Sequence, residues 1–437
     1  MRSVDLELVK WMNAKNRKPL LVRGARQVGK TFSIERLGRE HFEVFCKIDF
    51  EEEPELKVAF ELDLKPERIL KDVFSRKKIK MIPGKTLLFF DEIQACPKAI
   101  MSLRYFYEQM PDLHVIAAGS LLEFILDDEN FSFPVGRLQT LYVRPFSFNE
   151  FLSFKGEIQA LEWIKTATLQ EPIGQSTHKL LLRLLKEYFI MGGMPSVLYK
   201  TEEAEERKIE QRSILEMYSN DFGKYAKYSK QKYLRILFER APYLVGGHFK
   251  YSKIDPDVDS RELRVALELL SRSGLIHRIY HSASSGIPLG SQVNEKKFKL
   301  LFLDIGLLNS KMNVPIDLLS QEDLIMMHDG ALAEQFVGQE LIANANPYYA
   351  PDLFYWEREK KGADAEIDYV LEINGQVVPV EVKAGKTGRL RSMRQFMEEK
   401  TSLIGVRISQ APLSKGNGIL SIPLYMVSEI SRLLKEV

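Results

Sequence analysis

The residues best placed to do chemistry lie in the stretch PLLVRGARQVGKT, from Pro19 to Thr31. It contains the spacing GxxxxGK[ST], in which two glycines let successive backbone N–H groups turn inward toward phosphate oxygens. In this pattern Lys30 reaches the β- and γ-phosphates of a nucleotide, and the Thr31 hydroxyl ligates Mg²⁺. The predicted nucleotide-binding residues here are Gly24, Ala25, Arg26, Gln27, Val28, Gly29, Lys30 and Thr31. The alternative is a chance match in a glycine-containing loop, which the strand–loop–helix context disfavours.

A second reactive stretch runs from Thr86 to Glu92, with the sequence TLLFFDE. Four apolar residues that end in two carboxylates are typical of a buried parallel strand whose carboxyl end opens into an active site. Asp91 is placed to hold the water shell of Mg²⁺, and Glu92 to polarise the attacking water. An ordinary strand ending in solvated acids is the alternative, and the phosphate motif upstream argues against it.

A third set of reactive residues lies in IDYVLEINGQVVPVEVK, from Ile367 to Lys383. The pair Asn374-Gly375 between alternating apolar residues is the strongest short hairpin signal. A two-residue turn there places Asp368 directly opposite Glu381. Facing carboxylates destabilise a strand pair unless a cation lies between them.

A Mg²⁺ or Mn²⁺ ion would satisfy both Asp368 and Glu381. Lys383 lies on the same face as Glu381, where it can orient a water or stabilise charge that develops on a phosphate. The alternative is a structural hairpin whose acids pair with Lys383, Arg389 or Arg391.

The whole chain has the composition of a soluble, multidomain protein. Its 437 residues are too many for one ordinary core, so two to four domains are expected. The net charge is +2, so any nucleic-acid surface must be local. A charged N-terminus and short apolar runs indicate no signal peptide and no membrane contact, and the two cysteines indicate reduced thiols. We therefore expect a cytoplasmic location.

The strands that must position these residues are readable as apolar runs. We expect them at 20–22, 43–50, 86–92, 113–120 and 138–143. Ser120 ends the fourth strand, where it either senses the γ-phosphate or caps the next helix. Arg137 precedes the fifth strand and could serve a neighbouring subunit's nucleotide as an arginine finger, which would require a homo-oligomer. The alternative for Arg137 is a surface pair with the acidic run 127–129.

These motifs carry a family resemblance. GARQVGKT, LLFFDEIQ, VIAAGS and FPVGRLQTLYVRPFSFNEF resemble the AAA+ P-loop ATPases, in particular the bacterial and archaeal branch with a C-terminal nuclease-like domain. The resemblance implies a five-stranded αβα sandwich with Walker A and Walker B motifs. It implies the roles given above for Lys30, Thr31, Asp91, Glu92, Ser120 and Arg137. The chain has no Asn-Lys-Xaa-Asp string of guanine readers, so ATP is favoured over GTP.

The middle of the chain is predicted to be largely helical. From Phe148 the helical spacing indicates a lid over the nucleotide, which ends at the tight turn Gly192-Gly193. The segment 223–240 interleaves basic residues with tyrosines, as in a nucleic-acid surface or simply a solvated helix face. Segment 260–312 has the helix, strand, loop and strand of a winged helix, which either contacts DNA or acts as a spacer.

The C-terminal hairpin carries a second resemblance. An Asp, a turn and then Glu-Xaa-Lys resemble the PD-(D/E)xK nuclease core, over about 329–414. The resemblance implies Glu334 as a third metal-binding carboxylate beside Asp368 and Glu381. The chain departs from the pattern in two places: Pro379 interrupts a strand, and Ile367 replaces the leading proline. Such a domain can lose cleavage and keep only DNA or partner binding.

The combined prediction is an α/β multidomain protein. It comprises a P-loop AAA+ αβα sandwich (1–150), a helical lid (151–225), a winged helix (226–312) and a C-terminal α/β restriction-endonuclease-like domain (313–437). We expect Mg²⁺-dependent ATP hydrolysis coupled to DNA or to a protein partner. The alternative is a nucleotide-switched adaptor whose nuclease-like domain is inactive and binds a protein partner. A small-molecule nucleotide kinase ranks below both, because it leaves the C-terminal motifs without a purpose.

Overall fold

The computed structural model describes residues 2–120, 122, 134, 136–200, 203–225, 228–314, 330–359, 365–385 and 390–437. The chain divides into two compact units. Unit 1 comprises Met1–Arg144, Arg272–Gly274 and Asn346–Ala350, and unit 2 comprises Pro145–Ser271, Leu275–Ala345 and Pro351–Val437. The division after Arg144 lies near the predicted end of the ATPase core at residue 150. The boundaries predicted at 225 and 312 both fall inside unit 2, so the finer division stays a prediction.

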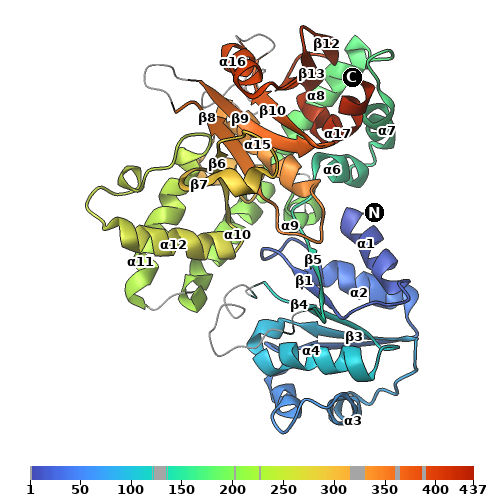
Figure 1. Cartoon of the computed structure of the whole chain (residues 1–437). Coiled ribbons are helices and arrows are strands. Elements are labelled where there is room, and N and C mark those ends of the chain that lie inside the picture. The colour runs from blue at the N-terminus through green and yellow to red at the C-terminus, as the bar shows by residue number, and fades with distance from the viewer. Residues whose placement is uncertain are drawn as a thin grey trace. The chain divides into compact units, whose positions relative to one another are not determined.

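Unit 1 is built on a five-stranded parallel sheet with the strand order β2-β3-β4-β1-β5 (Figure 1). Its helices and strands are α1 (Ser3–Met12), β1 (Leu20–Arg23), α2 (Lys30–His41), β2 (Val44–Asp49), α3 (Pro66–Lys77), β3 (Thr86–Asp91), α4 (Pro97–Gln109), β4 (His114–Ala118) and β5 (Gln139–Tyr142). All five strands predicted from apolar runs are confirmed. The carboxyl ends of β1, β3 and β4 lead into the phosphate loop, Asp91-Glu92 and Ser120, so the topology brings these residues to one edge of the sheet.

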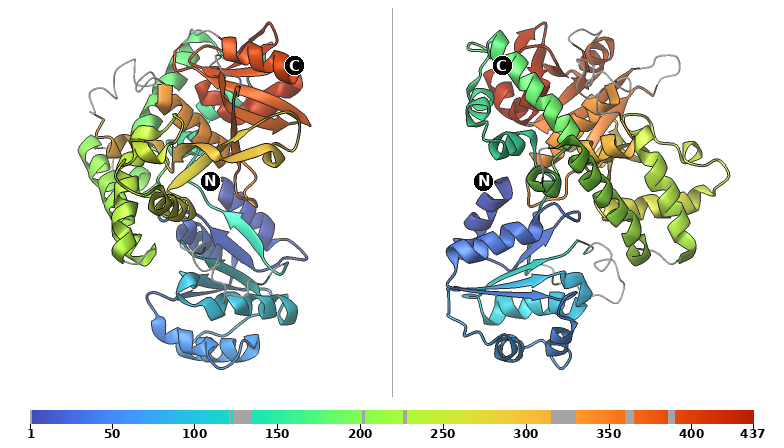
Figure 2. Two further views of the ribbon diagram at one scale, coloured as in Figure 1. Left: turned by 60° about the vertical axis from the view of Figure 1, so that its left-hand side comes forward. Right: turned by 180° about the vertical axis from the view of Figure 1, so that it is seen from behind.

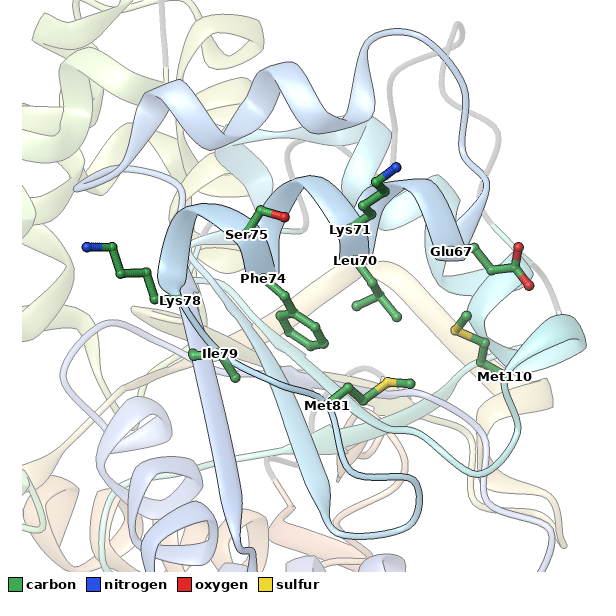
Figure 3. Close-up of a pocket in the computed structure, with 9 residues that line it drawn as sticks. All are labelled: Glu67, Leu70, Lys71, Phe74, Ser75, Lys78, Ile79, Met81 and Met110. Carbon is green, nitrogen blue, oxygen red and sulfur yellow. The ribbon is translucent and has the colours of Figure 1, made fainter.

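Helices cover both faces of this sheet, with α1 and α2 on one side and α3 and α4 on the other (Figure 1). Strand β3 is buried along its whole length, which explains its uninterrupted apolar sequence. The core beneath α3 and α4 is rich in phenylalanine, and Phe90 lies 6.0 Å from Phe106 between ring centroids. A shallow groove borders α3, with Leu70, Phe74 and Met81 at its floor (Figure 3). None of the predicted site residues lines this groove.

Unit 2 contains a mixed eight-stranded sheet and most of the helices. Its strands are β6 (Ile276–Ser282), β7 (Val293–Phe302), β8 (Leu353–Glu357), β9 (Glu366–Ile373), β10 (Gln376–Val382), β11 (Gly405–Ser409), β12 (Ser414–Gly416) and β13 (Ile419–Pro423). Its helices are α6 (Phe148–Phe154), α7 (Ile158–Thr166), α8 (Gln175–Met191), α9 (Pro195–Lys200), α10 (Ala204–Tyr225), α11 (Tyr228–Arg240), α12 (Ser260–Arg272), α13 (Ile305–Lys311), α15 (Ala331–Ala343), α16 (Arg391–Lys400) and α17 (Ile430–Leu433). The strand order is β12-β13-β11-β10-β9-β8-β6-β7.

The strands assigned to a winged helix belong to this larger sheet. β6 and β7 form the expected antiparallel pair, but β6 also pairs in parallel with β8, and Tyr280 lies opposite Phe354. Figure 2 shows the gold strands β6 and β7 continuing the orange strands β8 to β10. One hydrogen-bonded sheet thus crosses the boundary predicted at residue 312, and that boundary stays a prediction.

The β9–β10 hairpin has the register predicted from Asn374-Gly375. Ile373 pairs with Gln376, and the pairing continues to Val380 opposite Tyr369. Both turn residues have positive φ, as a two-residue hairpin turn requires. Helix α16 packs on one face of the hairpin, where Phe396 joins a core with Ile367. Helix α15 lies on the other face, where the hydroxyl of Tyr369 donates to the Glu334 carbonyl at 2.8 Å.

The helices predicted as a nucleotide lid pack within unit 2. His178 of α8 contacts the Tyr425 hydroxyl through Nδ1 at 2.7 Å and the Gln410 carbonyl through Nε2 at 3.0 Å. After α8 the chain turns at Gly192, whose φ is +72°, and the next amide, of Gly193, donates to Asp304 at 2.6 Å. The turn predicted from the glycine pair is thus confirmed. No helix in the described part of the chain is long and apolar enough to cross a membrane.

Candidate nucleotide site and acid cluster

The loop between β1 and α2 has a backbone suited to anion binding. Gly24, Gln27 and Gly29 have φ of 143°, 59° and 92°. A Cβ at Gly24 would overlap the carbonyl oxygen of Val143, so only glycine fits there. Helix α2 begins at Lys30, which places the positive end of its dipole and the N–H groups of its first turn beside the loop.

Neighbouring groups hold the loop in place. Val28 is fully buried, and its carbonyl accepts a hydrogen bond from the Arg2 guanidinium at 2.7 Å. Ala25 is also buried. Arg26 lies 3.9 Å from Glu51, measured between Nη2 and Oε2. These contacts hold the loop in its observed conformation.

Lys30 is folded onto the loop itself. Its Nζ donates to the carbonyls of Gly24 at 2.9 Å and Ala25 at 2.8 Å. Burial lowers the pKa of Lys30 to about 8, against the opposing charges of Glu92 and Asp91. A negatively charged ligand at the loop would therefore favour the charged form of this lysine.

Thr31 and Asp91 meet at the carboxyl end of β3. The Thr31 hydroxyl donates to Asp91 Oδ2 at 3.0 Å. Lys47, from β2, lies 3.1 Å from the same oxygen and 3.2 Å from Glu35. Burial raises the pKa of Asp91, while Lys47 and Thr31 stabilise its charged form. Asp91 is thus a buried carboxylate held by a hydroxyl and a cation.

Glu92 and Ser120 lie together beside Asp91. Glu92 has a positive φ of 45°, which turns its side chain away from the line of β3. Its carboxylate accepts hydrogen bonds from the Gln94 amide and, at 3.5 Å, from the Ser120 hydroxyl. The structure therefore brings Ser120 to Glu92, as expected if both act on the terminal phosphate.

Arg137 lies on the surface of unit 1. Its Nε is 3.0 Å from Glu108, and 44% of its side chain is exposed. The acidic run 127–129, its alternative partner in the sequence, lies outside the described residues. The arginine-finger role stays a prediction.

The predicted metal-binding acids come together in unit 2, but each has another partner. Asp368 Oδ2 accepts from the Val382 amide at 2.7 Å, and Glu381 Oε1 lies 2.5 Å from Lys383 Nζ. Within the described ranges, no group of three His, Cys, Asp or Glu side chains is arranged to hold a metal ion. Of the alternative partners in the sequence, Lys383 is confirmed for Glu381, and Arg389 lies outside the described residues.

The cation among these acids is Lys299 of β7. Its Nζ contacts the Glu366 carboxylate and lies 3.6 Å from Glu334 Oε2 and 3.8 Å from Asp368 Oδ1. Burial favours neutral Lys299, but the surrounding carboxylates outweigh burial and raise its pKa. For Glu366, burial opposes the charge, yet its hydrogen bond with His248 and the charge of Lys299 lower its pKa to about 2.

Sequence reasoning missed Lys47, Lys299 and His248. Lys47 stands in an otherwise apolar strand, VFCKID, and Lys299 in the strand KKFKLLF. A lysine inside a buried strand is a signal that could have been used, because buried lysines are rare unless paired. The residues next to each lysine in the sequence do not reveal which carboxylates it pairs with.

The parallel sheet, the glycine-bent loop and the Thr31–Asp91 pair define a P-loop nucleotide-binding domain. Residues 16–152 match the model of an AAA domain, which agrees with the P-loop fold of this part of the chain. Residues 182–317 match a domain of unknown function (DUF8612), and residues 329–427 match another (DUF4143).

Two solved structures are similar in part. The Walker-type ATPase of Pyrococcus abyssi is 16% identical, with 71% of this chain and 95% of that chain covered and a TM-score of 0.45. PCH-2 of C. elegans is 11% identical, with 61% and 66% covered and a TM-score of 0.24. The comparison with curated proteins found no match.

Proposed function

We propose that the protein binds ATP with Mg²⁺ and hydrolyses it at the phosphate loop of unit 1. The observation that carries this proposal is the hydrogen bond of 3.0 Å between the Thr31 hydroxyl and Asp91. In P-loop ATPases a hydroxyl at the start of the helix and a strand-end Asp hold the magnesium ion. The donor set fits the ion, and the loop that only Gly24 allows fits the phosphates.

Each side chain has a defined task in this proposal. Lys30 exchanges its carbonyl acceptors for the β- and γ-phosphate oxygens. Glu92 orients the attacking water and accepts its proton. Ser120 binds the γ-phosphate and reports its presence to Glu92 through their hydrogen bond. Bound Mg²⁺ neutralises the charge that develops on the phosphates.

ATP turnover by purified variants tests the proposal. Lys30→Ala removes the phosphate contact, so both nucleotide binding and turnover should fall. Glu92→Gln keeps the shape but cannot accept a proton, so binding should persist while turnover falls by about 10²–10⁴-fold. Lys85→Ala is the matched control, because Lys85 is exposed and pairs with the exposed Glu43 at 2.5 Å. Equal turnover by wild type, Lys30→Ala and Glu92→Gln would refute the assignment.

We further propose that the nucleotide state controls unit 2 and that the protein works in the cytoplasm on DNA or on a protein partner. Arg137 is proposed to complete the ATPase site of a neighbouring copy. If so, the ATPase activity of the wild type per chain should rise with protein concentration as copies associate. Arg137→Ala should lower that activity most in the same range of protein concentration. Activity independent of both concentration and Arg137 would contradict the oligomer.

The inactive-nuclease alternative is favoured by one observation, the Lys299 ammonium among the carboxylates of Glu334, Glu366 and Asp368. In this alternative unit 2 binds a protein partner and cuts nothing. Nicking of plasmid DNA with Mg²⁺ or Mn²⁺ tests it, with Asp368→Ala as the control. Metal-dependent nicking lost in Asp368→Ala would support an active nuclease. No nicking and no salt-sensitive DNA binding would support the adaptor.

A further inference from the structure

The acid cluster of unit 2 is neutralised from within the chain. Lys299 is 1% exposed, and its Nζ lies within 4 Å of three carboxylates. It also lies 5.4 Å from the centre of the Tyr355 ring, whose face attracts a cation. A divalent ion bound by these carboxylates would need its oxygens at about 2.0–2.6 Å from a common point. The ammonium already occupies the space between them.

Three further oxygens of the cluster have partners of their own. Glu366 Oε2 accepts from His248 Nε2 at 2.7 Å, and Asp368 Oδ2 accepts from the Val382 amide at 2.7 Å. Glu381 Oε1 is bound by Lys383, and Glu381 Oε2 is buried without a hydrogen-bond partner among the described residues. A Mg²⁺ or Mn²⁺ ion needs several oxygens, so it would have to displace these partners to bind here.

The lysine and the acids come from separate parts of the sequence. Lys299 lies in the region 182–317, and the carboxylates lie in 329–427, which match two different domain models. The strand β6 joins them, because it pairs with β7 on one side and β8 on the other. The segment 182–317 thus supplies, through Lys299, the positive charge that balances the carboxylates of the segment 329–427.

We propose that Lys299 is a built-in cation that takes the place of a divalent metal ion in this cluster. Unit 2 of the wild-type protein then binds no Mg²⁺ or Mn²⁺. Removal of the ammonium turns the same carboxylates into a divalent-cation site. The inference concerns unit 2 alone and holds whether or not unit 1 hydrolyses ATP.

Titration with Mn²⁺, with free ion measured by electron paramagnetic resonance, tests the proposal on the full chain. All proteins carry Asp91→Asn and are free of nucleotide, so that unit 1 contributes no metal site. With Lys299 intact we expect no site tighter than about 1 mM. Lys299→Gln should gain one Mn²⁺ per chain, bound at least about tenfold more tightly. Adding Asp368→Asn to Lys299→Gln should abolish the gain.

Lys297→Gln is the matched control, because Lys297 is two residues away on β7 and pairs instead with Glu357 at 2.7 Å. It should leave Mn²⁺ binding unchanged. The proposal would be overturned if the protein with Lys299 intact binds one Mn²⁺ and loses it on Asp368→Asn. This outcome counts even if Lys299→Gln fails to fold. A folded Lys299→Gln protein that gains no Mn²⁺ would also overturn it.

Discussion

Glu340 is the buried acid whose effect on stability can be worked out most directly. It lies on α15, with 2% of its surface exposed. Its Oε1 accepts a hydrogen bond from the backbone N–H of Phe148 at 2.7 Å. Its Oε2 accepts one from the side-chain amide of Asn344 at 3.3 Å. Burial raises the pKa of Glu340 from 4.5 to about 8, although both hydrogen bonds favour its charged form. Glu340→Gln keeps an oxygen acceptor for Phe148 and removes the titration.

The raised pKa fixes the direction of the pH dependence. Below about pH 4.5 Glu340 is protonated in both the folded and the unfolded chain, so it does not change the free energy of unfolding with pH. Between pH 4.5 and 8 the unfolded chain has released this proton and the folded chain retains it, so stability falls as pH rises. At about 1.4 kcal/mol per pH unit, the free energy of unfolding loses at most about 5 kcal/mol over this window. Glu340→Gln should not show this loss.

Urea unfolding between pH 4.5 and 8.5 measures the difference. A Trp11→Phe background leaves Trp163 and Trp356, both in unit 2, as the fluorescent reporters. The stability of Glu340→Gln relative to the background should rise with pH up to about 8 and then level off. Glu162→Gln, at an exposed position on α7, should give a curve parallel to the background. A difference that stays constant with pH would refute the buried, protonated Glu340.

Three further substitutions address single contacts. Gly24→Ala forces a Cβ into a backbone carbonyl at a φ of 143°, so it should cost about 1–3 kcal/mol and weaken ATP binding in calorimetry. Lys47→Met leaves buried Asp91 without its ammonium, so it should destabilise the nucleotide-free protein by about 1–3 kcal/mol, and Mg²⁺-ATP should raise the Tm more than in wild type. Gly192→Ala combines a φ of +72° with overlap onto Asp304, so it should lower the Tm by several degrees, whereas Gly174→Ala, which meets no neighbour, should not.

Local sequence signals predicted the elements that carry the candidate nucleotide site. Strand β3 could be found because burial on both faces demands an unbroken apolar run, and its end because Asp91 and Glu92 interrupt that run. The β9–β10 register could be found because Asn374 and Gly375 both adopt the positive φ of a two-residue turn. In both cases the controlling interactions lie within a few residues.

The architecture of unit 2 could not be predicted in the same way. The pairing of β6 with β8 joins strands that are separated in the sequence by β7, α13 and α15, and nothing in either strand specifies the other. The hairpin β6–β7 looks like a self-contained wing when its local pattern is considered alone. A central strand differs from an edge strand in having a second hydrogen-bonded neighbour. The tertiary fold supplies that neighbour, so the local sequence does not predict it.

The same limit applies to the acids, and here solvent access separates the two sites. Asp91 and Asp368 both look like metal ligands in sequence, and each is met in the structure by a lysine from another strand. Lys47 has 27% of its side chain exposed and contacts the same Asp91 oxygen as the Thr31 hydroxyl. Under the proposed function, a Mg²⁺ ion would displace Lys47 toward water. Lys299 is 1% exposed and would have to leave three carboxylates with no water to receive its charge. Under the two proposals, the cation of unit 1 exchanges for Mg²⁺, whereas the cation of unit 2 stays in place as part of the fold.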